Sequence, residues 1–300
     1  MSFMRGKNDK VLMNIAVLSG KGGAGKTFIS TNLAYTASVL GRKTCYADCD
    51  AEEPNGHIFL KPGESRKYEA GIKTPVINSS KCTGCRKCAD HCEFNAIIVI
   101  KGKAKVFDEL CHGCGACAIV CSEQAVKEQF TVTGDIIDGK SNAVPGLRFI
   151  EGRLRVGKPM PVPVIEKIEE ILPSEGDSFL DSPPGASCPV VETASFADYV
   201  VIAAEPTPFG INDMAIAVDL LSALDKKFSI IINRSNPERD RIIEDYCREK
   251  GCIIIGKIPD RIETARIYSE GSLAAEKDPE TYKIFSELLK RIYIEAGRAK

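Results

Sequence analysis

The chain has 300 residues and a nearly balanced charge, with 40 lysines and arginines against 41 aspartates and glutamates. A net charge of −1 gives no electrostatic case for binding nucleic acid or an anionic membrane, although it leaves room for a local basic patch. No run of about 18 apolar residues predicts a membrane span, and the polar N-terminus lacks the apolar core of a signal peptide. We therefore expect a cytoplasmic protein with two domains, or with one large domain that carries an insertion.

Cysteine is frequent in this chain: there are 13, and eight of them stand in two arrays of identical spacing. A secreted disulfide scaffold is usually short and carries a signal peptide. In a reducing compartment, tight cysteine arrays favour metal ligation. We therefore expect this part of the chain to bind metal.

The first 50 residues predict a strand, a glycine-rich turn, a helix and a second strand. Residues 11–19 are apolar and β-rich, and residues 27–40 have helical spacing up to Gly41. Residues 43–48 form the second predicted strand. This order is typical of the start of a parallel α/β sheet.

The same alternation returns in the second half of the chain. Strands are predicted at residues 177–181, 198–204, 226–232 and 252–257. Helices are predicted at residues 164–172, 211–224, 237–250 and 279–295. One face of the last helix carries Phe285, Leu288, Leu289 and Ile292. Such a face also suits a membrane-surface helix, but docking on the sheet is commoner and is what we expect.

The segment between these halves departs from the α/β pattern. Residues 76–127 are dominated by cysteines, and the two halves of this segment repeat each other. After it, residues 129–156 predict an extended hairpin with turns at Gly134, Gly139 and Gly152. We therefore expect an α/β domain in two parts, residues 1–75 and 128–300, with an inserted domain at 76–127.

A glycine-rich loop follows the first predicted strand. Residues 20–27 read GKGGAGKT and match the phosphate-binding pattern G-x-x-x-x-G-K-[ST] between a strand and a helix. Glycines let successive N–H groups turn toward phosphate oxygens, and the helix N-terminus adds a favourable field. Lys26 would reach the β- and γ-phosphates, and the Thr27 hydroxyl would bind Mg²⁺. The predicted nucleotide-binding residues in this loop are Gly20, Lys21, Gly22, Gly23, Ala24, Gly25, Lys26 and Thr27.

Lys21 is a second lysine inside this loop, and GKGGAGKT resembles the deviant Walker A motif of the MinD/ParA/Mrp family of P-loop ATPases. That family includes the nitrogenase iron protein. The resemblance implies that Lys21 reaches the nucleotide of a partner subunit, and hence that the chain forms a homodimer with ATP. It also implies that Lys21 and Lys26 are catalytic.

Further segments resemble motifs of the same family. Residues 48–50 (DCD) are similar to its switch I, in which Asp50 would orient or activate the attacking water and Asp48 would support Mg²⁺ through water. Asp181 opens DSPPG, which is similar to Walker B with switch II, and would hold the Mg²⁺ shell. Asn233 stands where the family reads adenine, and residues 256–260 (GKIPD) resemble its other adenine-side loop. Ordinary solvation of strand ends would explain any one of the carboxylates, but their order along the chain favours the family site.

Each cysteine array has the spacing C-x2-C-x2-C-x3-C found in bacterial ferredoxins, where the fourth cysteine ligates the other cluster. The predicted ligands of the first [4Fe–4S] cluster are Cys82, Cys85, Cys88 and Cys121. The predicted ligands of the second are Cys111, Cys114, Cys117 and Cys92. Zinc bound by paired C-x2-C motifs is the competing interpretation, but two complete four-cysteine runs favour the clusters.

Five cysteines lie outside the arrays. Cys45, Cys247 and Cys252 fall in apparent core strands or helices, where small buried thiols are common. Cys49 and Cys188 flank the two segments that resemble switches. We expect packing roles for them, with a bridging cluster at Cys188 as the alternative.

These patterns predict an α/β, parallel-sheet P-loop NTPase of the MinD-like, deviant Walker A type with an inserted small α+β ferredoxin-like domain. The expected cofactors are ATP, Mg²⁺ and two [4Fe–4S] clusters. The first hypothesis is an ATPase that couples hydrolysis of the phosphoric anhydride to electron transfer, with a redox partner. The alternatives are an ATP-dependent assembly or carrier protein for iron–sulfur or other metallocofactors, with a client protein, and a spatial-organisation ATPase in the MinD/ParA manner.

Overall fold

The computed structural model describes residues 12–298, which divide into two compact units. Unit 1 comprises the chain up to Tyr68, Ile136–Arg153 and the chain from Ile165 onward, and unit 2 comprises Glu69–Asp135 and Leu154–Val164. The strands are β1 (Met13–Leu18), β2 (Thr44–Asp48), β3 (Pro62–Ile77), β4 (Ile97–Ile100), β5 (Lys103–Val106), β6 (Val126–Ser141), β7 (Arg148–Leu154), β8 (Asp177–Asp181), β9 (Tyr199–Ala204), β10 (Phe228–Ser235) and β11 (Ile254–Pro259). The helices are α1 (Lys26–Val39), α2 (Gly56–Leu60), α3 (Lys87–Asp90), α4 (Ala116–Ile119), α5 (Val162–Ile171), α6 (Cys188–Ser195), α7 (Pro208–Ala223), α8 (Arg241–Lys250), α9 (Ile262–Ser269), α10 (Ala274–Lys277) and α11 (Pro279–Glu295), with a short 3₁₀ helix at Asp108–Leu110.

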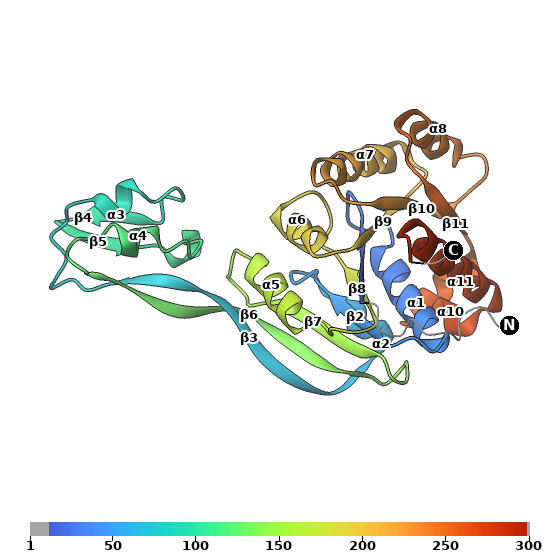
Figure 1. Cartoon of the computed structure of the whole chain (residues 1–300), viewed down its shortest axis with the longest axis horizontal. Coiled ribbons are helices and arrows are strands. Elements are labelled where there is room, and N and C mark those ends of the chain that lie inside the picture. The colour runs from blue at the N-terminus through green and yellow to red at the C-terminus, as the bar shows by residue number, and fades with distance from the viewer. Residues whose placement is uncertain (1–11, 299–300) are drawn as a thin grey trace. The chain divides into compact units, whose positions relative to one another are not determined.

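Unit 1 is built on a mainly parallel sheet (Figure 1). The strand order is β11-β10-β9-β1-β8-β2-β7-β6-β3, and the pairs from β11 through β7 are parallel. Strands β8 and β9 are buried at every position, as expected for parallel strands covered on both faces. The predicted α/β fold with a parallel sheet is therefore confirmed.

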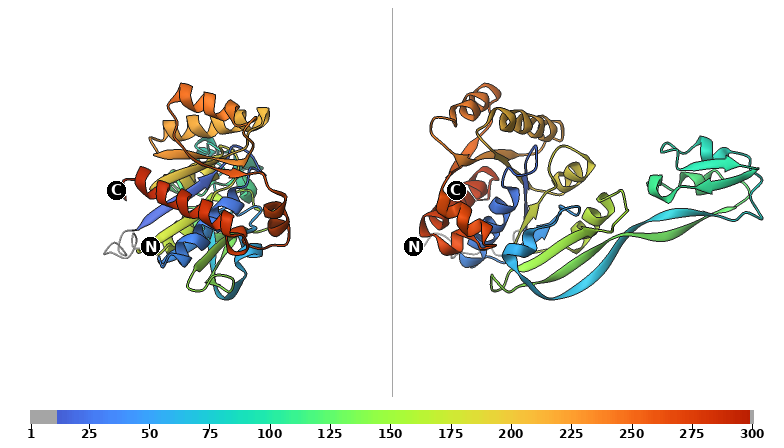
Figure 2. Two further views of the ribbon diagram at one scale, coloured as in Figure 1. Left: turned by 90° about the vertical axis from the view of Figure 1, so that its right-hand side faces the viewer. Right: turned by 180° about the vertical axis from the view of Figure 1, so that it is seen from behind.

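Helices cover both faces of this sheet (Figures 1 and 2). Helix α1 packs on β1, β2 and β8 and contacts α11, whereas α6 packs on β1 and α7 packs on β9. On α11, the four predicted docking residues are each at most 2% exposed and belong to the main core, so the expectation that this helix docks on the domain is confirmed: Phe285, Leu288, Leu289 and Ile292. Among the described residues, no helix is both long enough and apolar enough to cross a bilayer.

The sequence misplaced the turns around the extended segment. Gly134 and Gly139 lie inside β6 and Gly152 lies inside β7, while the chain turns between Ser141 and Arg148. At Gly139 a Cβ would come within 2.9 Å of the Glu64 carbonyl oxygen, so this glycine permits a close approach of neighbouring strands. This glycine therefore indicates a close approach of two backbones and not a turn.

Unit 2 contains a small two-stranded antiparallel sheet, β4 with β5, in which Ile97 faces Val106 and Ile100 faces Lys103. Helices α3 and α4 follow residues with positive φ, at 69° for Arg86 and 75° for Gly115. The core of the unit combines small apolar side chains with cysteine sulfurs, as in the cluster of Ile97, Ala104, Cys117 and Val126. Apolar burial in a core of this size contributes only a small part of the stability that a folded unit needs.

A buried carboxylate in unit 1 forms an ion pair and also a hydrogen bond that links the C-terminal helix to the sheet. Asp177 of β8 is fully buried; it accepts hydrogen bonds from the Arg42 guanidinium and, at 2.8 Å, from the Tyr293 hydroxyl of α11. The guanidinium also lies 4.5 Å from the centre of the Tyr293 ring.

Replacing Arg42 by Met should therefore lower the free energy of unfolding by about 3–5 kcal/mol, because the buried Asp177 carboxylate loses its charged partner. Tyr293→Phe should cost about 1–3 kcal/mol, since the carboxylate keeps its arginine. The control is Arg248→Met, which removes a surface pair with Asp245 (2.7 Å) and should cost less than about 1 kcal/mol. Denaturant unfolding measures all three, and equal losses for the two arginine variants would contradict the assignment.

Candidate functional site

The glycine-rich loop joins β1 to α1 at the carboxyl edge of the sheet. Two of its glycines are irreplaceable on local geometry. A Cβ at Gly20 would lie 1.9 Å from the Asp213 carbonyl oxygen, and one at Gly25, where φ is +93°, would lie 2.1 Å from Asn233 Nδ2. Glycine is therefore required here by close packing as well as by backbone conformation.

Asn233 supports this loop from the end of β10. Its side chain is 5% exposed, and its Nδ2 donates a 2.9 Å hydrogen bond to the carbonyl oxygen of Ala24. The residue that the family resemblance assigns to adenine therefore also fixes the phosphate loop. Its adenine role stays a prediction.

Two carboxylates lie side by side next to the loop. Asp48 ends β2, Asp181 ends β8, and the parallel register places them directly opposite each other, each at most 1% exposed. Burial raises the pKa of Asp181 to about 6, against the opposing positive charge of Lys26. Tyr46 donates to Asp181 Oδ2 at 3.0 Å, whereas the buried Oδ1 has no hydrogen-bond partner. A buried, unpartnered carboxylate oxygen beside Lys26 fits a divalent cation.

Asp48 has different partners from Asp181. Its carboxylate accepts backbone N–H bonds from Asp50 (3.1 Å), Asn55 (3.1 Å) and Gly56 (2.9 Å). Burial and the neighbouring Asp181 charge raise its pKa well above the ordinary value. The carboxylate that the sequence assigns to Mg²⁺ support thus also determines the path of residues 48–56.

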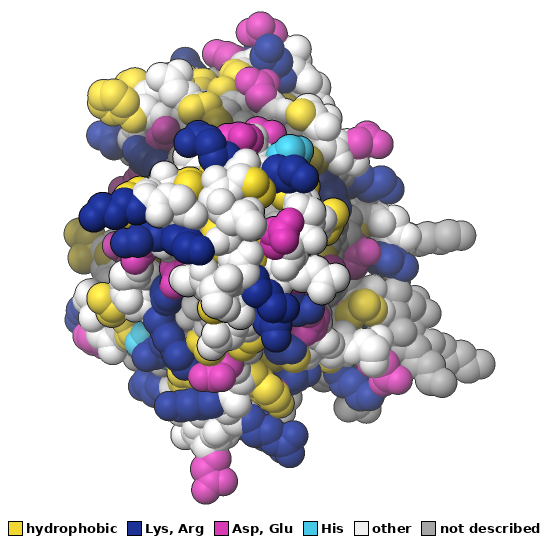
Figure 3. Space-filling model, turned by 90° about the vertical axis from the view of Figure 1, so that its left-hand side faces the viewer, with side chains coloured by type: hydrophobic (Ala, Val, Ile, Leu, Met, Phe, Trp, Pro, Cys, Tyr) yellow, Lys and Arg dark blue, Asp and Glu magenta, His cyan; other side chains and the backbone are white. Residues whose placement is uncertain are grey.

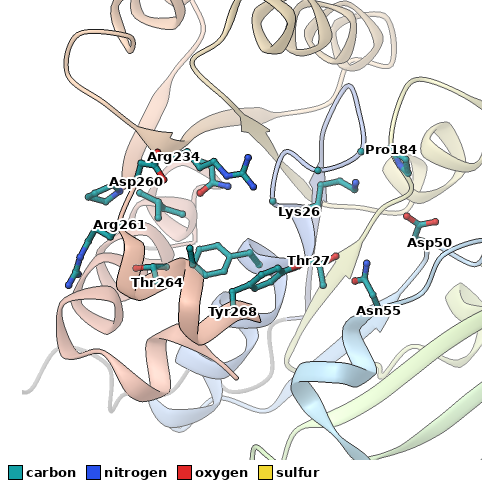
Figure 4. A pocket seen from close by; sticks show the side chains of 18 of the residues that line it. Lys26, Thr27, Asp50, Asn55, Pro184, Arg234, Asp260, Arg261, Thr264 and Tyr268 are labelled. Atoms are coloured by element: carbon teal, nitrogen blue, oxygen red, sulfur yellow. The ribbon is translucent and has the colours of Figure 1, made fainter. Parts of the chain in front are cut away.

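A cavity of about 330 Å³ opens beside the loop (Figure 4). Lys26, Thr27 and Asp50 lie toward one end, and Asp260 and Thr264 toward the other. Burial raises the pKa of Asp50, and the charge of Lys26 opposes this shift. The remaining lining residues are Gly22, Gly23, Gly25, Phe28, Glu53, Asn55, Pro184, Asn233, Arg234, Ile258, Pro259, Arg261, Ala265 and Tyr268.

Lys21 does not line this cavity. Its Nζ lies 3.6 Å from Asp213 Oδ2, and its side chain is 37% exposed. Of the three predicted catalytic residues, the structure therefore brings Lys26 and Asp50 together and leaves Lys21 outside.

Sequence reasoning missed the aromatic wall of the cavity. Tyr268 of α9 stacks on Phe59, with ring centres 4.6 Å apart, and meets Phe28 edge to face at 5.7 Å. No motif joins these three residues. Their only sequence signal is the aromatic side chain at position 28, directly after the loop.

The eight array cysteines line two separate cavities within unit 2. One, here called cavity 1, is lined by Cys82, Cys85, Cys88 and Cys121. The other, cavity 2, is lined by Cys92, Cys111, Cys114 and Cys117. Within residues 12–298, no three His, Cys, Asp or Glu side chains form a group that could hold a single metal ion.

Backbone N–H groups point at several of these sulfurs. Ala104 donates to Cys82 at 3.4 Å, Ala96 to Cys92 at 3.3 Å and Ala125 to Cys121 at 3.3 Å. Such donors stabilise thiolate, and the pKa of Cys82 is lowered by them. Four cysteines per cavity, with N–H donors to sulfur, are a donor set that fits an iron–sulfur cluster.

The other cysteines differ in exposure. Cys45, Cys49 and Cys247 are buried and Cys252 is partly buried, as packing roles predict. Cys188 begins α6 and is exposed, so the packing role expected for it is wrong. The chain after Asp181 forms a surface loop, and the Cys188 thiol at its end therefore lies outside the core.

Comparison with known proteins gives several matches over most of the chain. The family profile CbiA, described as the CobQ/CobB/MinD/ParA nucleotide binding domain, matches residues 15–274. A structure of the septum site-determining protein MinD of Pyrococcus horikoshii, complexed with Mg-ADP, superposes with a TM-score of 0.59 at 17% identity, covering 97% of this chain and 100% of that one. An uncharacterised protein of Methanocaldococcus jannaschii is 31% identical over 226 residues, 75% of this chain and 79% of its own length.

Two shorter matches involve other kinds of protein. The pyruvate synthase subunit PorD of Thermotoga maritima is 39% identical over 80 residues, 25% of this chain and 81% of the subunit. An iron–sulfur cluster carrier protein of Methanococcus maripaludis is 42% identical over 52 residues, 17% of this chain and 18% of the carrier.

The contact of Asn233 with the loop can be tested without adenine. Asn233→Ala should weaken binding of Mg-ATP and of inorganic tripolyphosphate alike, by about tenfold, because the loop loses its hydrogen-bonded support. Competition against a fluorescent ATP analogue measures both affinities. Ser235→Ala, on the same strand but outside the cavity, should leave them unchanged. A loss confined to ATP would contradict the loop-support role.

Proposed function

The chain belongs to the CobQ/CobB/MinD/ParA nucleotide-binding domain family, and from this premise we propose that it is an ATPase whose nucleotide cycle controls electron transfer through two [4Fe–4S] clusters. One observation carries the proposal. The same chain contains a phosphate-binding loop and two cavities, each lined by three cysteines of one array and the fourth of the other. That exchange of the fourth ligand is the ferredoxin pattern.

The residues of unit 1 would bind and orient the nucleotide. The loop N–H groups and the N-terminus of α1 suit phosphate oxygens, and Lys26 would neutralise the charge that develops on the β- and γ-phosphates. Thr27 and the unpartnered oxygen of Asp181 would hold Mg²⁺, which supplies further charge neutralisation. Asp50 lines the same cavity and would orient the attacking water.

Lys21 would act on a second subunit. It stands outside the cavity of its own chain, and the family resemblance gives it a role across a dimer interface. We therefore include an ATP-bound homodimer in the proposal, with Lys21 of each subunit near the nucleotide of the other.

In unit 2 the cysteine thiolates would hold the clusters, which supply one-electron transfer when bound. The N–H donors from Ala96, Ala104 and Ala125 reduce the negative charge on sulfur and so tune the reduction potential.

Only a short stretch of chain separates the segment that carries Asp50 from the strand that leads to the cysteine arrays. Residues 48–56 carry Asp50, α2 follows at once, and β3 begins at Pro62 and has residues in both units. Contacts with a γ-phosphate commonly order such a loop, and hydrolysis releases it. A change in residues 48–56 would therefore act on the start of β3.

A second candidate function is ATP-dependent delivery of an iron–sulfur cluster. The local match to an iron–sulfur cluster carrier protein favours it. Transfer of iron and sulfide to an apo-protein that required ATP hydrolysis would support delivery over electron transfer.

The division of the cysteines predicts paired losses. After anaerobic reconstitution we expect about eight iron and eight sulfide per chain. Cys88→Ala and Cys121→Ala should each remove the same EPR signal, although the residues belong to different arrays, and Cys92→Ala and Cys117→Ala should each remove the other. Cys188→Ala is the control and should retain both signals. A colourless, zinc-loaded protein would contradict the cluster assignment.

Coupling predicts that Mg-ATP changes the redox behaviour of the clusters. The midpoint potentials from an EPR-monitored titration should shift when Mg-ATP is added. Lys26→Ala should lose this response and keep both clusters, because the lysine belongs to unit 1 only. Equal potentials and equal affinity for a redox partner, with and without Mg-ATP, would count against coupling while leaving the cluster assignment intact.

A further inference from the structure

The two cysteine cavities have equal ligand sets but oppositely charged surroundings. Five exposed cations surround cavity 1 and are here called the basic rim: Lys81, Arg86, Lys87, Lys101 and Lys103. Two carboxylates accompany them, Glu123 on the cavity wall and Asp90, which pairs with Arg86 at 3.5 Å. The excess charge at cavity 1 is positive.

The basic rim is held against cavity 1 by specific contacts. Lys81 directly precedes Cys82, and Arg86 and Lys87 line the cavity. The hairpin turn that carries the last two cations packs on the array: a Cβ at Gly84 would lie 2.3 Å from the Gly102 carbonyl oxygen. Lys103 Nζ donates to the Cys82 carbonyl oxygen at 2.6 Å.

Cavity 2 has acidic surroundings. Asp108 and Glu109 precede Cys111, Glu93 follows Cys92, and Glu128 lines the wall. The described wall of cavity 2 carries one carboxylate, Glu128, and one lysine, Lys73; the other three carboxylates are sequence neighbours of its cysteines.

We propose that the basic rim of cavity 1 is the docking surface for an acidic one-electron carrier protein, and that electrons pass between that carrier and this chain at cavity 1. This inference rests on the proposed function, since it requires clusters in the cavities. Complementary charge steers association and excludes partners of like charge. Cavity 2 lacks such a basic rim, and the carboxylates near it would repel the same carrier.

The surface around the rim suits such a partner. Figure 3 looks onto the side of Figure 1 on which β4 and β5 are labelled, and Lys and Arg side chains gather on that face. Ile100, 46% exposed, directly precedes Lys101 and provides an apolar contact beside the charges. Protein interfaces commonly combine an apolar centre with a charged rim.

The test measures electron transfer to small probes of known charge. The reconstituted full chain is reduced with dithionite, desalted without oxygen, and oxidised in a stopped-flow instrument by the anion cobalt(III)–EDTA. Each one-electron oxidation of the protein reduces one cobalt(III) to cobalt(II). The wild-type rate should fall as salt is raised, because the attraction to the basic rim is screened.

A charge-reversal variant with a matched control isolates the rim. K81E/K87E/K101E should slow oxidation by cobalt(III)–EDTA about tenfold at low salt and reverse the salt dependence. Lys103 is kept because it bonds Cys82. K227E/K250E/K283E changes net charge equally at exposed positions of unit 1 and should stay within about twofold of wild type. Equal slowing in both variants, or in neither, would overturn the proposal.

A second measurement uses a protein carrier and needs no turnover. An acidic flavodoxin should bind the wild-type chain at low salt, and K81E/K87E/K101E should lose this binding in biolayer interferometry while the control retains it. The neutral variant K81Q/K87Q/K101Q, which is gentler on folding, should give intermediate values for both rate and binding. Flavodoxin binding that survives charge reversal would overturn the docking assignment.

Iron and sulfide counting on the same samples separates the two proposals. Preparations without clusters would end the proposed function. Preparations with clusters whose oxidation by cobalt(III)–EDTA does not depend on the rim charge would end this inference alone.

Discussion

The parallel register of β1, β8 and β2 is the constraint on which the nucleotide site depends. Asp181 lies opposite Asp48 on one side and opposite Val17 on the other, so two carboxylates and the start of the glycine-rich loop meet at one sheet edge. A slip of one residue would turn a carboxylate into the opposite face of the sheet.

Two adjacent buried carboxylates oppose folding unless each has partners. Asp48 is offset by three backbone N–H donors, and Asp181 by the Tyr46 hydroxyl and the charge of Lys26. One oxygen of Asp181 has no such partner. Buried polar groups without partners are rare in proteins, and where they occur they often mark a site for an ion or ligand. The burial of these two carboxylates thus opposes folding, and the unpartnered oxygen that it leaves is also where a cation could bind.

The sequence predicted those parts of the fold that rest on local patterns. Strand β8 and helix α11 have the predicted bounds, because their apolar residues recur at strand and helix spacing. The long strand β3 was missed, since its first half is polar and exposed and resembles a loop. The contact of Asn233 with Ala24 and the position of Tyr268 were also missed, because each depends on packing between segments more than 200 residues apart.

The eight cysteines line the two cavities in the division that the ferredoxin pattern predicts, whereas the charge around each set was not predictable. Net charge is −1, and a near-neutral total conceals a positive environment at one cavity and a negative one at the other. Lys101 and Lys103 lie well away from the first array in sequence, and only the packing of the β4–β5 turn on Gly84 brings them to cavity 1. Because four cysteines line each cavity, a difference in potential or in partner between clusters bound there would depend on such surroundings. Positive charge stabilises the reduced, more negative state of a bound group. A cluster in cavity 1, inside the basic rim, would therefore be reduced more readily than one in cavity 2.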